Sequence, residues 1–484
     1  MEYDVVLIGS GFGSLSAAAL LARQGLRVCV LEQAKYPGGC ASSYKRKGYW
    51  FETGATTLVG LDQNMPLRYL LDKTGIQIKA QKLELPMQVH LPSGQMLTRY
   101  RNLEAWLAEA ERVFGKYNQR PFWQHCFKVS QQVWQASLQQ RSFPISNTKD
   151  LILSVCRARP GQLALLPAAF RTMEDVLRKY DLLQNKPFLD FVNEQLLITA
   201  QNHIHEVNEL FGATALCYTL YSNYYVPGGL INLVKPVEAY ITENNGEIKY
   251  GQQVESVKKT GRMYWIKTNN QTFQSKYVIS GIPLNNTLQL FKNERLKSKL
   301  GKYILPSEKL NGAFTMGLVL KLKQPPAVLH HQVHVPEGLP LIGSKSFFIS
   351  FSDPNDTLRA PAGQMVASIS THVPDPENLR IEQKYILEDA ILTALCKAGL
   401  IDLKSILVKH SATPGAWNFW THRAYGAVGG YPQYKQIKPW QMKDARLDHD
   451  GAYICGDSTY PGQGIPGVCL SGIIAVEKLL QDHF

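Results

Sequence analysis

A run of small residues near the start of the chain, followed by an acid about twenty residues later, has the spacing needed to hold a dinucleotide. Gly9 permits a tight turn, and Gly11 lets backbone approach a pyrophosphate at the N-terminus of the following helix. Ser14 takes the place of a third glycine and is small enough for close packing, with Gly13 beside it to relieve crowding. Glu32 is placed to accept hydrogen bonds from a ribose hydroxyl. The pattern predicts a dinucleotide site rather than a chance glycine turn.

The elements that would position these residues form a βαβ unit. Residues 3–8 predict a buried parallel strand, residues 15–23 an Ala- and Leu-rich helix, and residues 27–31 a second strand that ends at Glu32. This order indicates an α/β fold with a Rossmann-like domain.

The segment after Glu32 separates two kinds of dinucleotide enzyme. A nicotinamide enzyme would continue its alternating units here, whereas YPGGCASSYKRKGYWFETGAT places glycines in loops suited to covering a longer, extended cofactor. Together with the preceding LEQ, this run resembles the FAD-binding opening of the phytoene desaturase and carotenoid isomerase family, within the amine-oxidase-like flavoproteins. The resemblance implies FAD as the cofactor.

Later segments are similar to the same family in the same order. Residues 225–257 resemble its glycine-marked helix and the strand at Val254, whose backbone meets the adenine. Residues 452–472 resemble its C-terminal flavin motif, in which Asp457 bonds the ribitol–pyrophosphate side and the turn from Pro461 to Pro466 meets the isoalloxazine. The motifs and the resemblance together predict cofactor contacts at Gly9, Gly11, Phe12, Gly13, Ser14, Glu32, Gln33, Gly38, Gly39, Gly54, Ala55, Val254, Gly456, Asp457, Gly464, Ile465 and Pro466.

The sequence predicts two domains, each built from separated segments. The FAD-binding domain is expected to comprise residues 1–80, 226–300 and 430–484. Residues 85–225 are mostly helical in pattern and residues 310–375 are rich in predicted strands, so 81–225 and 301–429 are assigned to a mixed sheet and helix substrate domain.

Aromatic and small residues gather in ATPGAWNFWTHRAYGAVGGYPQY, residues 412–434, and the family carries a similar segment near the flavin. Side chains there would line a tunnel for a flat, extended substrate, although Trp and Phe are more often plain core. The predicted lining residues are Trp417, Phe419, Trp420, Tyr425 and Tyr460. His422 and Arg423 are weak candidates for handling a proton or charge, and the catalytic residue is otherwise unknown.

Composition and charge limit the kinds of partner, and the cellular compartment, that we expect. The net charge of +13 is spread along the chain with no nucleic-acid motif, so we expect no nucleic-acid partner. The eight cysteines show no paired spacing, and the acidic first residues do not resemble a signal peptide, which favours the cytoplasm. The histidines of HHQVH, residues 330–334, are expected in a loop because prolines flank them, and no metal site is predicted there.

Residues 150–183 mix apolar runs with Arg157, Arg159, Arg171, Arg178 and Lys179. This pattern fits either an interfacial surface on a membrane or ordinary core helices with basic outer faces. Peripheral membrane contact is favoured because the family acts on insoluble hydrocarbons.

The resemblance implies hydride transfer from an allylic carbon of a carotenoid to the flavin, which is desaturation. Carotenoid isomerisation and retinol-saturase-like activity use the same motifs. A flavin amine oxidase and a non-catalytic carotenoid-binding flavoprotein are the further alternatives. Since the sequence contains one dinucleotide cradle, quinone or oxygen is the expected electron acceptor.

Overall fold

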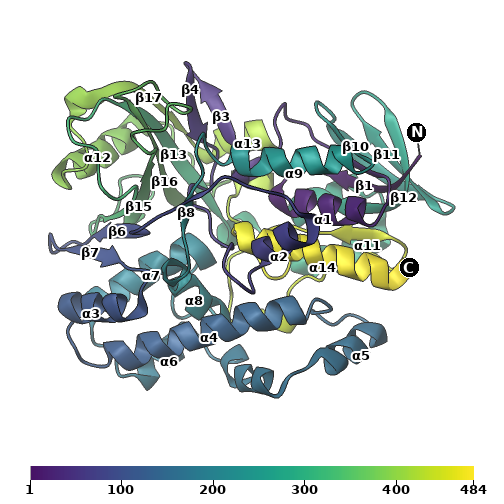
Figure 1. Cartoon of the computed structure of the whole chain (residues 1–484), viewed down its shortest axis with the longest axis horizontal. Helices are drawn as coiled ribbons and strands as arrows, with labels where there is room; N and C mark the ends of the chain where they lie inside the picture. The colour runs from purple at the N-terminus through teal and green to yellow at the C-terminus, as the bar shows by residue number, and fades with distance from the viewer. Residues whose placement is uncertain (1) are drawn as a thin grey trace.

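The computed structural model describes residues 2–484 and contains two seven-stranded sheets, which lie in opposite halves of Figure 1. The first has the order β10-β11-β12-β1-β2-β9, with β18 paired to β12. Its β1, β2, β9, β12 and β18 are parallel, and β10 and β11 extend it in antiparallel fashion. The bounds are β1 Glu2–Ile8, β2 Val28–Leu31, β9 Gly246–Lys249, β10 Val254–Thr260, β11 Met263–Thr268, β12 Thr272–Ser280 and β18 Ala452–Ile454.

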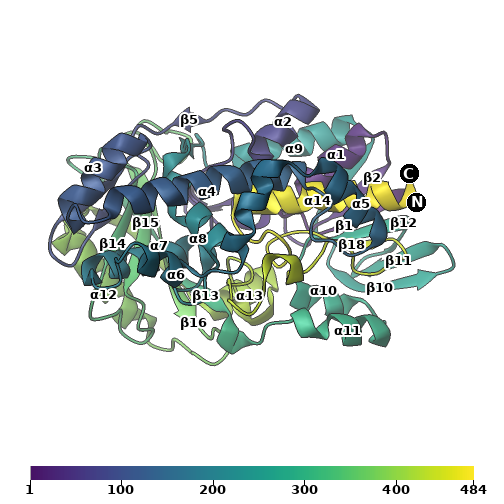
Figure 2. The same ribbon diagram turned by 90° about the horizontal axis from the view of Figure 1, so that it is seen from below.

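Alternate residues of β1 build a core on each face of this sheet. Val5 and Leu7 face one core, whereas Val6 and Ile8 face the other. Helices α1, α2, α9 and α14 cover the first face, and α10 and α11 cover the second (Figures 1 and 2). Their bounds are α1 Phe12–Arg23, α2 Pro66–Thr74, α9 Ile231–Glu243, α10 Leu284–Leu290, α11 Glu294–Leu300 and α14 Ile465–His483.

The second sheet has the order β17-β13-β16-β15-β14-β6-β7, in which only the β14–β6 pair is parallel among the described residues. Helix α12, Lys384–Lys397, packs on one of its faces. The strands are β6 Met87–His90, β7 Met96–Arg99, β13 Asn311–Leu320, β14 His330–His334, β15 Ser346–Phe351, β16 Met365–Pro374 and β17 Ile406–Ala412.

A helical layer lies beside the β6–β7 end of the second sheet and shares a core with these two strands (Figure 1). Its helices are α3 Leu103–Phe114, α4 Gln119–Gln139, α6 Met173–Lys179, α7 Lys186–Ala200 and α8 Glu209–Leu216. Helix α5, Thr148–Arg157, extends from this layer beneath α14. The remaining elements are the β3–β4 hairpin, Ser43–Arg46 and Tyr49–Glu52, the small β5–β8 pair, Gln81–Lys82 and Tyr224–Tyr225, and α13, Pro414–Thr421.

The predicted α/β fold with a Rossmann-like domain and a mixed second domain is confirmed. The two sheets draw their strands from the two groups of segments that the sequence had separated. One local prediction is wrong: His330–His334 is not a loop but strand β14. Pro325, Pro326 and Pro336 lie outside its ends, where a missing backbone N–H removes no hydrogen bond from the sheet.

Candidate cofactor and active site

The glycine turn between β1 and α1 has the geometry expected of a phosphate cradle. Gly9 has a φ of +83°, which favours glycine, and its N–H donates to the carbonyl of Leu31 at 2.8 Å. Gly11 is the N-cap of α1 and makes no side-chain capping bond, so the first turn of the helix is not capped by protein side chains. A Cβ at Gly11 would come no closer than 3.8 Å to other protein atoms. The side of Gly11 is therefore open to a ligand.

The serine that replaces the third glycine is accommodated by a glycine elsewhere in the chain. A Cβ on Gly281, which follows β12, would lie 1.6 Å from the Ser14 hydroxyl oxygen. Gly281 thus supplies the space that the fingerprint glycine usually supplies. The sequence VISGIP places Gly281 directly after a strand, but only the tertiary structure shows that Ser14 lies against it.

Glu32 lies at the carboxyl end of β2, as predicted. One of its carboxylate oxygens accepts from the Ser10 N–H at 2.8 Å and the Ser10 hydroxyl at 2.6 Å, and the other accepts from the Ala34 N–H at 2.8 Å. The Gln252 N–H donates to the Glu32 carbonyl at 2.8 Å, which brings the segment before Val254 to the same sheet edge. The carboxylate is therefore held beside the phosphate cradle.

The loop containing Gly38 and Gly39 lies directly on the glycine turn. The Gly38 N–H donates to the Ser10 carbonyl at 2.9 Å, and a Cβ on Gly39 would meet the Gly11 Cα at 3.4 Å. The Ala55 N–H, next to Gly54, donates to the Cys40 carbonyl at 3.0 Å. These contacts bring the second group of predicted cofactor residues against the first. The Gln33 amide nitrogen donates to the Thr421 carbonyl at 3.0 Å and connects α13 to this region.

The C-terminal motif meets the glycine turn through very close helix packing. A Cβ on Gly13 would lie 2.9 Å from the Val468 carbonyl oxygen, and one on Gly472 would lie 2.3 Å from the Gly13 carbonyl oxygen. Helix α14 has Gly464 as its N-cap and, like α1, makes no side-chain capping bond. Ile465 and Pro466 form its first turn. Two uncapped helix N-termini thus belong to the same packed unit, and both favour negative charge or oxygen acceptors.

The residues present fit an extended dinucleotide. Besides the open glycine turn and the two uncapped helices, two hydroxyls on either side of the β3–β4 hairpin, Ser42 Oγ and Thr57 Oγ1, are buried without a hydrogen-bond partner among residues 2–484. Buried polar atoms normally have partners, so these two hydroxyls indicate a missing polar ligand. The phosphate cradle, the carboxylate of Glu32 and the C-terminal turn would hold the two ends of such a molecule.

Asp457 and Arg423 form an ion pair beside the C-terminal motif. The Arg423 guanidinium donates to the Asp457 carboxylate at 2.8 Å and to the Ala427 carbonyl at 2.8 Å. Burial alone would lower the pKa of Arg423, but the Asp457 carboxylate raises it above its usual range. The pair leaves this part of the site without net charge. Gly456, before Asp457, donates its N–H to the Ser471 hydroxyl at 3.0 Å.

The predicted lining residues separate into two groups. Trp417 is buried, Tyr425 packs on Leu305 and Leu310, and Tyr460 lies edge-on to the Phe143 ring at 4.9 Å. Phe419 and Trp420 are instead 68% and 75% exposed on α13. The His422 side chain is also exposed, and its backbone carbonyl accepts from Asn286 at 2.7 Å. Their roles in binding and catalysis stay predictions.

A cluster of uncharged side chains that the sequence analysis missed connects the second sheet to the Pro461–Pro466 turn. The Gln201 amide nitrogen donates to Gln463 Oε1 at 3.2 Å and lies 3.4 Å from His372 Nε2. The Asn311 amide donates to Gln201 Oε1 at 3.2 Å. A Cβ on Gly429 would lie 2.0 Å from Gln201 Nε2, so this position has to be glycine for Gln201 to fit. The glycine pair in AVGGY was therefore the local sign in the sequence that another group approaches closely here.

Comparison with known proteins identifies the class. A model of the flavin-containing amine oxidoreductase family matches residues 15–480, and the chain belongs to that family. The flavin is thereby confirmed, and the dinucleotide cradle makes it FAD.

Particular relatives align along nearly the whole chain. A prolycopene isomerase of Daucus carota is 25% identical over 99% of this chain and 80% of its own length. A diapophytoene desaturase of Methylomonas is 22% identical over 99% of this chain and 95% of its own. The solved structure of a putrescine oxidase double mutant has a TM-score of 0.65 at 13% identity and covers 99% of each chain, which shows the shared fold.

Proposed function

We propose that this chain is an FAD-dependent carotenoid desaturase that oxidises C–C bonds of a long polyene. Bound FAD would supply the acceptor for a hydride from an allylic carbon of the substrate. The protein has to hold the cofactor at both ends, keep the substrate dry and orient it. The relatives named for carotenoid chemistry, which align over 99% of the chain, support this substrate class.

The observation that carries the proposal is that the carboxylate of the C-terminal flavin motif is already neutralised by an arginine. Asp457 is paired with Arg423, and the neighbouring polar groups are the amides of Gln201 and Gln463 and the imidazole of His372. Burial lowers the pKa of His372 to about 4, which keeps it neutral near pH 7. A cationic amine would find the Asp457 carboxylate already paired, whereas a hydrocarbon needs no counter-charge. These surroundings favour a polyene over an amine.

Isomerisation is the second candidate, and the similarity to the carrot prolycopene isomerase favours it. The same cradle and the same neutral surroundings serve a reaction without net oxidation. The two candidates differ in the mass of the product, so one experiment separates them.

That experiment is expression of the chain in bacteria that accumulate defined linear carotenes, followed by mass and absorption measurement of the products. Desaturation gives a product two hydrogens lighter with red-shifted absorption. An unchanged mass with an altered band shape would contradict desaturation and establish isomerisation. No change with any carotene would overturn both.

Gly11→Ala is the matched control, because its added methyl would come no closer than 3.8 Å to protein yet would occupy the approach to the pyrophosphate. We expect the variant to fold with an unchanged circular dichroism spectrum, to lose bound FAD and to give no product. Retention of FAD by the variant would contradict the placement of the cofactor.

We also propose peripheral contact with a membrane through α5 and the two following 3-10 helices, residues 160–165 and 167–169. No helix among residues 2–484 is long and apolar enough to cross a bilayer. Side chains that are large, apolar and about half exposed or more gather here: Leu151, Ile152, Val155, Leu163, Leu166 and Phe170. Arg159 is exposed beside them and would meet anionic headgroups.

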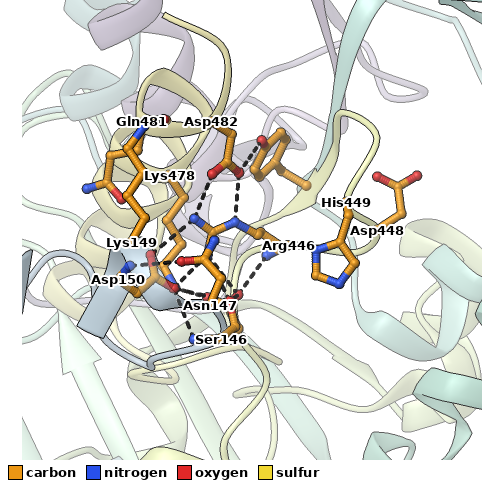
Figure 3. Close-up of polar contacts among 12 residues, drawn as sticks. Ser146, Asn147, Lys149, Asp150, Arg446, Asp448, His449, Lys478, Gln481 and Asp482 are labelled. Carbon is orange, nitrogen blue, oxygen red and sulfur yellow. Dashed lines mark hydrogen bonds and ion pairs between the residues drawn. The ribbon is translucent and has the colours of Figure 1, made fainter. Parts of the chain in front are cut away.

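The inner end of α5 is anchored rigidly, which distinguishes this surface from a frayed helix. Asp150 is fully buried and accepts from the Arg446 guanidinium at 2.7 Å and from the Lys478 ammonium at 3.3 Å (Figure 3). Asp444 and Asp482 complete the group. Since Lys478 and Asp482 belong to α14, the apolar surface of α5 is fixed to the helix that begins at the cofactor.

Sedimentation with anionic liposomes tests this contact. Ile152→Asp with Val155→Asp should abolish co-sedimentation, because both positions are exposed and apolar on α5. Leu403→Asp with Leu407→Asp, at similarly exposed positions before and within β17, which lies far from α5 in Figure 1, is the control and should bind like wild type. Equal loss or equal retention in both would contradict the proposal.

We propose that quinone or oxygen is the electron acceptor that reoxidises the flavin. A quinone-dependent increase in turnover under anaerobic conditions would test the quinone alternative.

A further inference from the structure

The second sheet has two chemically different faces. The outer face packs on α12 and carries apolar side chains, among them Phe314, Met316, Ile349 and Ile369. We call the opposite side the inner face; it looks toward α7 and the β3–β4 hairpin. A Cβ on Gly317 there would lie 2.9 Å from Phe51 of the hairpin, and Gln332 on the same face accepts from Gln195 of α7 at 2.6 Å.

A row of small and polar residues crosses the inner face. Strand register pairs His410 with Gly317, Gly317 with Ser368, Ser368 with Ser350, and Ser350 with His330. Directly paired residues of antiparallel strands face the same side, so these five residues, four of them with side chains, form one line from β17 to β14. We call this line the polar row.

Three polar atoms in the row have no hydrogen-bond partner among residues 2–484: His330 Nε2, Ser368 Oγ and His410 Nδ1. His330 is only 2% exposed, so bulk water does not solvate it. Its other ring nitrogen contacts the Ser350 hydroxyl, and His410 Nε2 contacts the Tyr44 hydroxyl at 2.7 Å. An unpaired buried polar atom is costly, and three in one row indicate a polar ligand that belongs among them.

The row is uncharged, which restricts that ligand. Burial lowers the pKa of His330 to about 3 and that of His410 to about 4, so both imidazoles are neutral near pH 7. Neutral imidazoles and hydroxyls both donate and accept hydrogen bonds, and they do not compensate a carboxylate or an ammonium ion. A hydroxyl or carbonyl oxygen fits this row.

The inner face also connects the row to the cofactor region. His372 lies on the same face of β16 as Ser368, and Gln201 joins it to Gln463 in the Pro461–Pro466 turn. Four residues of strand separate His372 from Ser368, which is about 13 Å. An extended chain with one part at the turn would therefore reach the row with another.

We propose that the polar row binds the oxygen of a hydroxyl or carbonyl group on the substrate, so that the preferred substrate is an oxygenated polyene rather than a pure hydrocarbon. This inference rests on the polyene substrate proposed above. Ser368 and His330 would hydrogen-bond that oxygen and set how far the chain extends past the cofactor. They act as specificity-determining residues and take no part in the redox step.

The test compares two probes with purified FAD-loaded protein in detergent: a linear hydrocarbon carotene and the same carotene bearing one terminal hydroxyl. Quenching of flavin fluorescence reports binding of each. We expect the hydroxylated probe to bind about tenfold more tightly, the equivalent of one good hydrogen bond. Ser368→Ala should remove most of this preference without weakening binding of the hydrocarbon, and His330→Phe should do the same.

Ser411→Ala is the matched control. Ser411 pairs with Met316 on the outer face and donates to Glu388 of α12, so its loss should leave the preference unchanged. Equal affinity of wild type for both probes, or a preference that survives in Ser368→Ala and His330→Phe, would overturn the inference alone. Failure of both probes to bind would overturn the polyene proposal and this inference together.

Discussion

The two faces of the second sheet are made by the same strands, but one is apolar and packed and the other carries polar side chains. Along β16, Ala367 and Ile369 point to α12 and are buried in a continuous apolar core. The alternate residues, Ser368, Ser370 and His372, point to the inner face. A period of two in one strand thus encodes stability on one side and recognition on the other. The inner face is not uniformly polar, because Val319 and Val366 pack under Phe51 at one edge.

The largest expected effect comes from the outer face. Ile369 is 2% exposed in the core beneath α12, so Ile369→Ala should lower the free energy of unfolding by about 2–5 kcal/mol through lost burial and a cavity. Urea denaturation measures the change. A loss under about 1 kcal/mol would mean that the outer face is not the tightly packed side.

Gly317→Ala tests whether the inner face is also closely packed where the hairpin covers it. A Cβ would lie 2.3 Å from His410 Cε1 and 2.9 Å from Phe51, so we expect a loss of about 1–3 kcal/mol from overpacking. The same denaturation series gives the value. Wild-type stability would indicate that the His410 ring moves freely.

A smaller effect is expected in the pH dependence. Burial and nearby positive groups lower the pKa of His330 from 6.5 to about 3. Below about pH 6.5 the unfolded chain takes up a proton that the folded chain refuses, so stability falls as the pH decreases, by up to about 1.4 kcal/mol per pH unit. His330→Gln should therefore lose less stability between pH 7 and pH 5 than wild type. Parallel pH profiles for the two proteins would refute the assignment.

The smallest effect is expected for Ser368→Ala. Its hydroxyl has no partner among residues 2–484, so its removal should change the free energy of unfolding by less than about 0.5 kcal/mol or raise it slightly. Denaturation without substrate measures this. A large loss would show that the hydroxyl already has a structural role.

The sequence was sufficient where chemistry and chain order coincide. Gly9, Gly11 and Glu32 lie within one βαβ unit, so their spacing alone predicted the cradle. The space that Gly281 leaves for Ser14 could not be predicted, because the two lie 267 positions apart in the sequence and only packing brings them together.

The other parts of the site could not be predicted, because they depend on the pairing of strands that are distant in the sequence. The polar row needs the register of β13, β14, β15, β16 and β17, and no local pattern specifies which serine faces which histidine. For His330–His334, the flanking prolines outweighed the strand pattern in the prediction, although they only mark where β14 ends. The exposed Phe419 and Trp420 show that an aromatic-rich segment does not reveal which rings turn inward.

The close contact between Gly13 and helix α14 has a consequence for biosynthesis. The phosphate cradle is translated several hundred residues before α14, the helix that closes against it. A nascent chain therefore carries an open, half-formed cradle until α14 has been translated. We expect tight loading of the cofactor only after that point, and a chain cut short before Gly472 should bind it weakly.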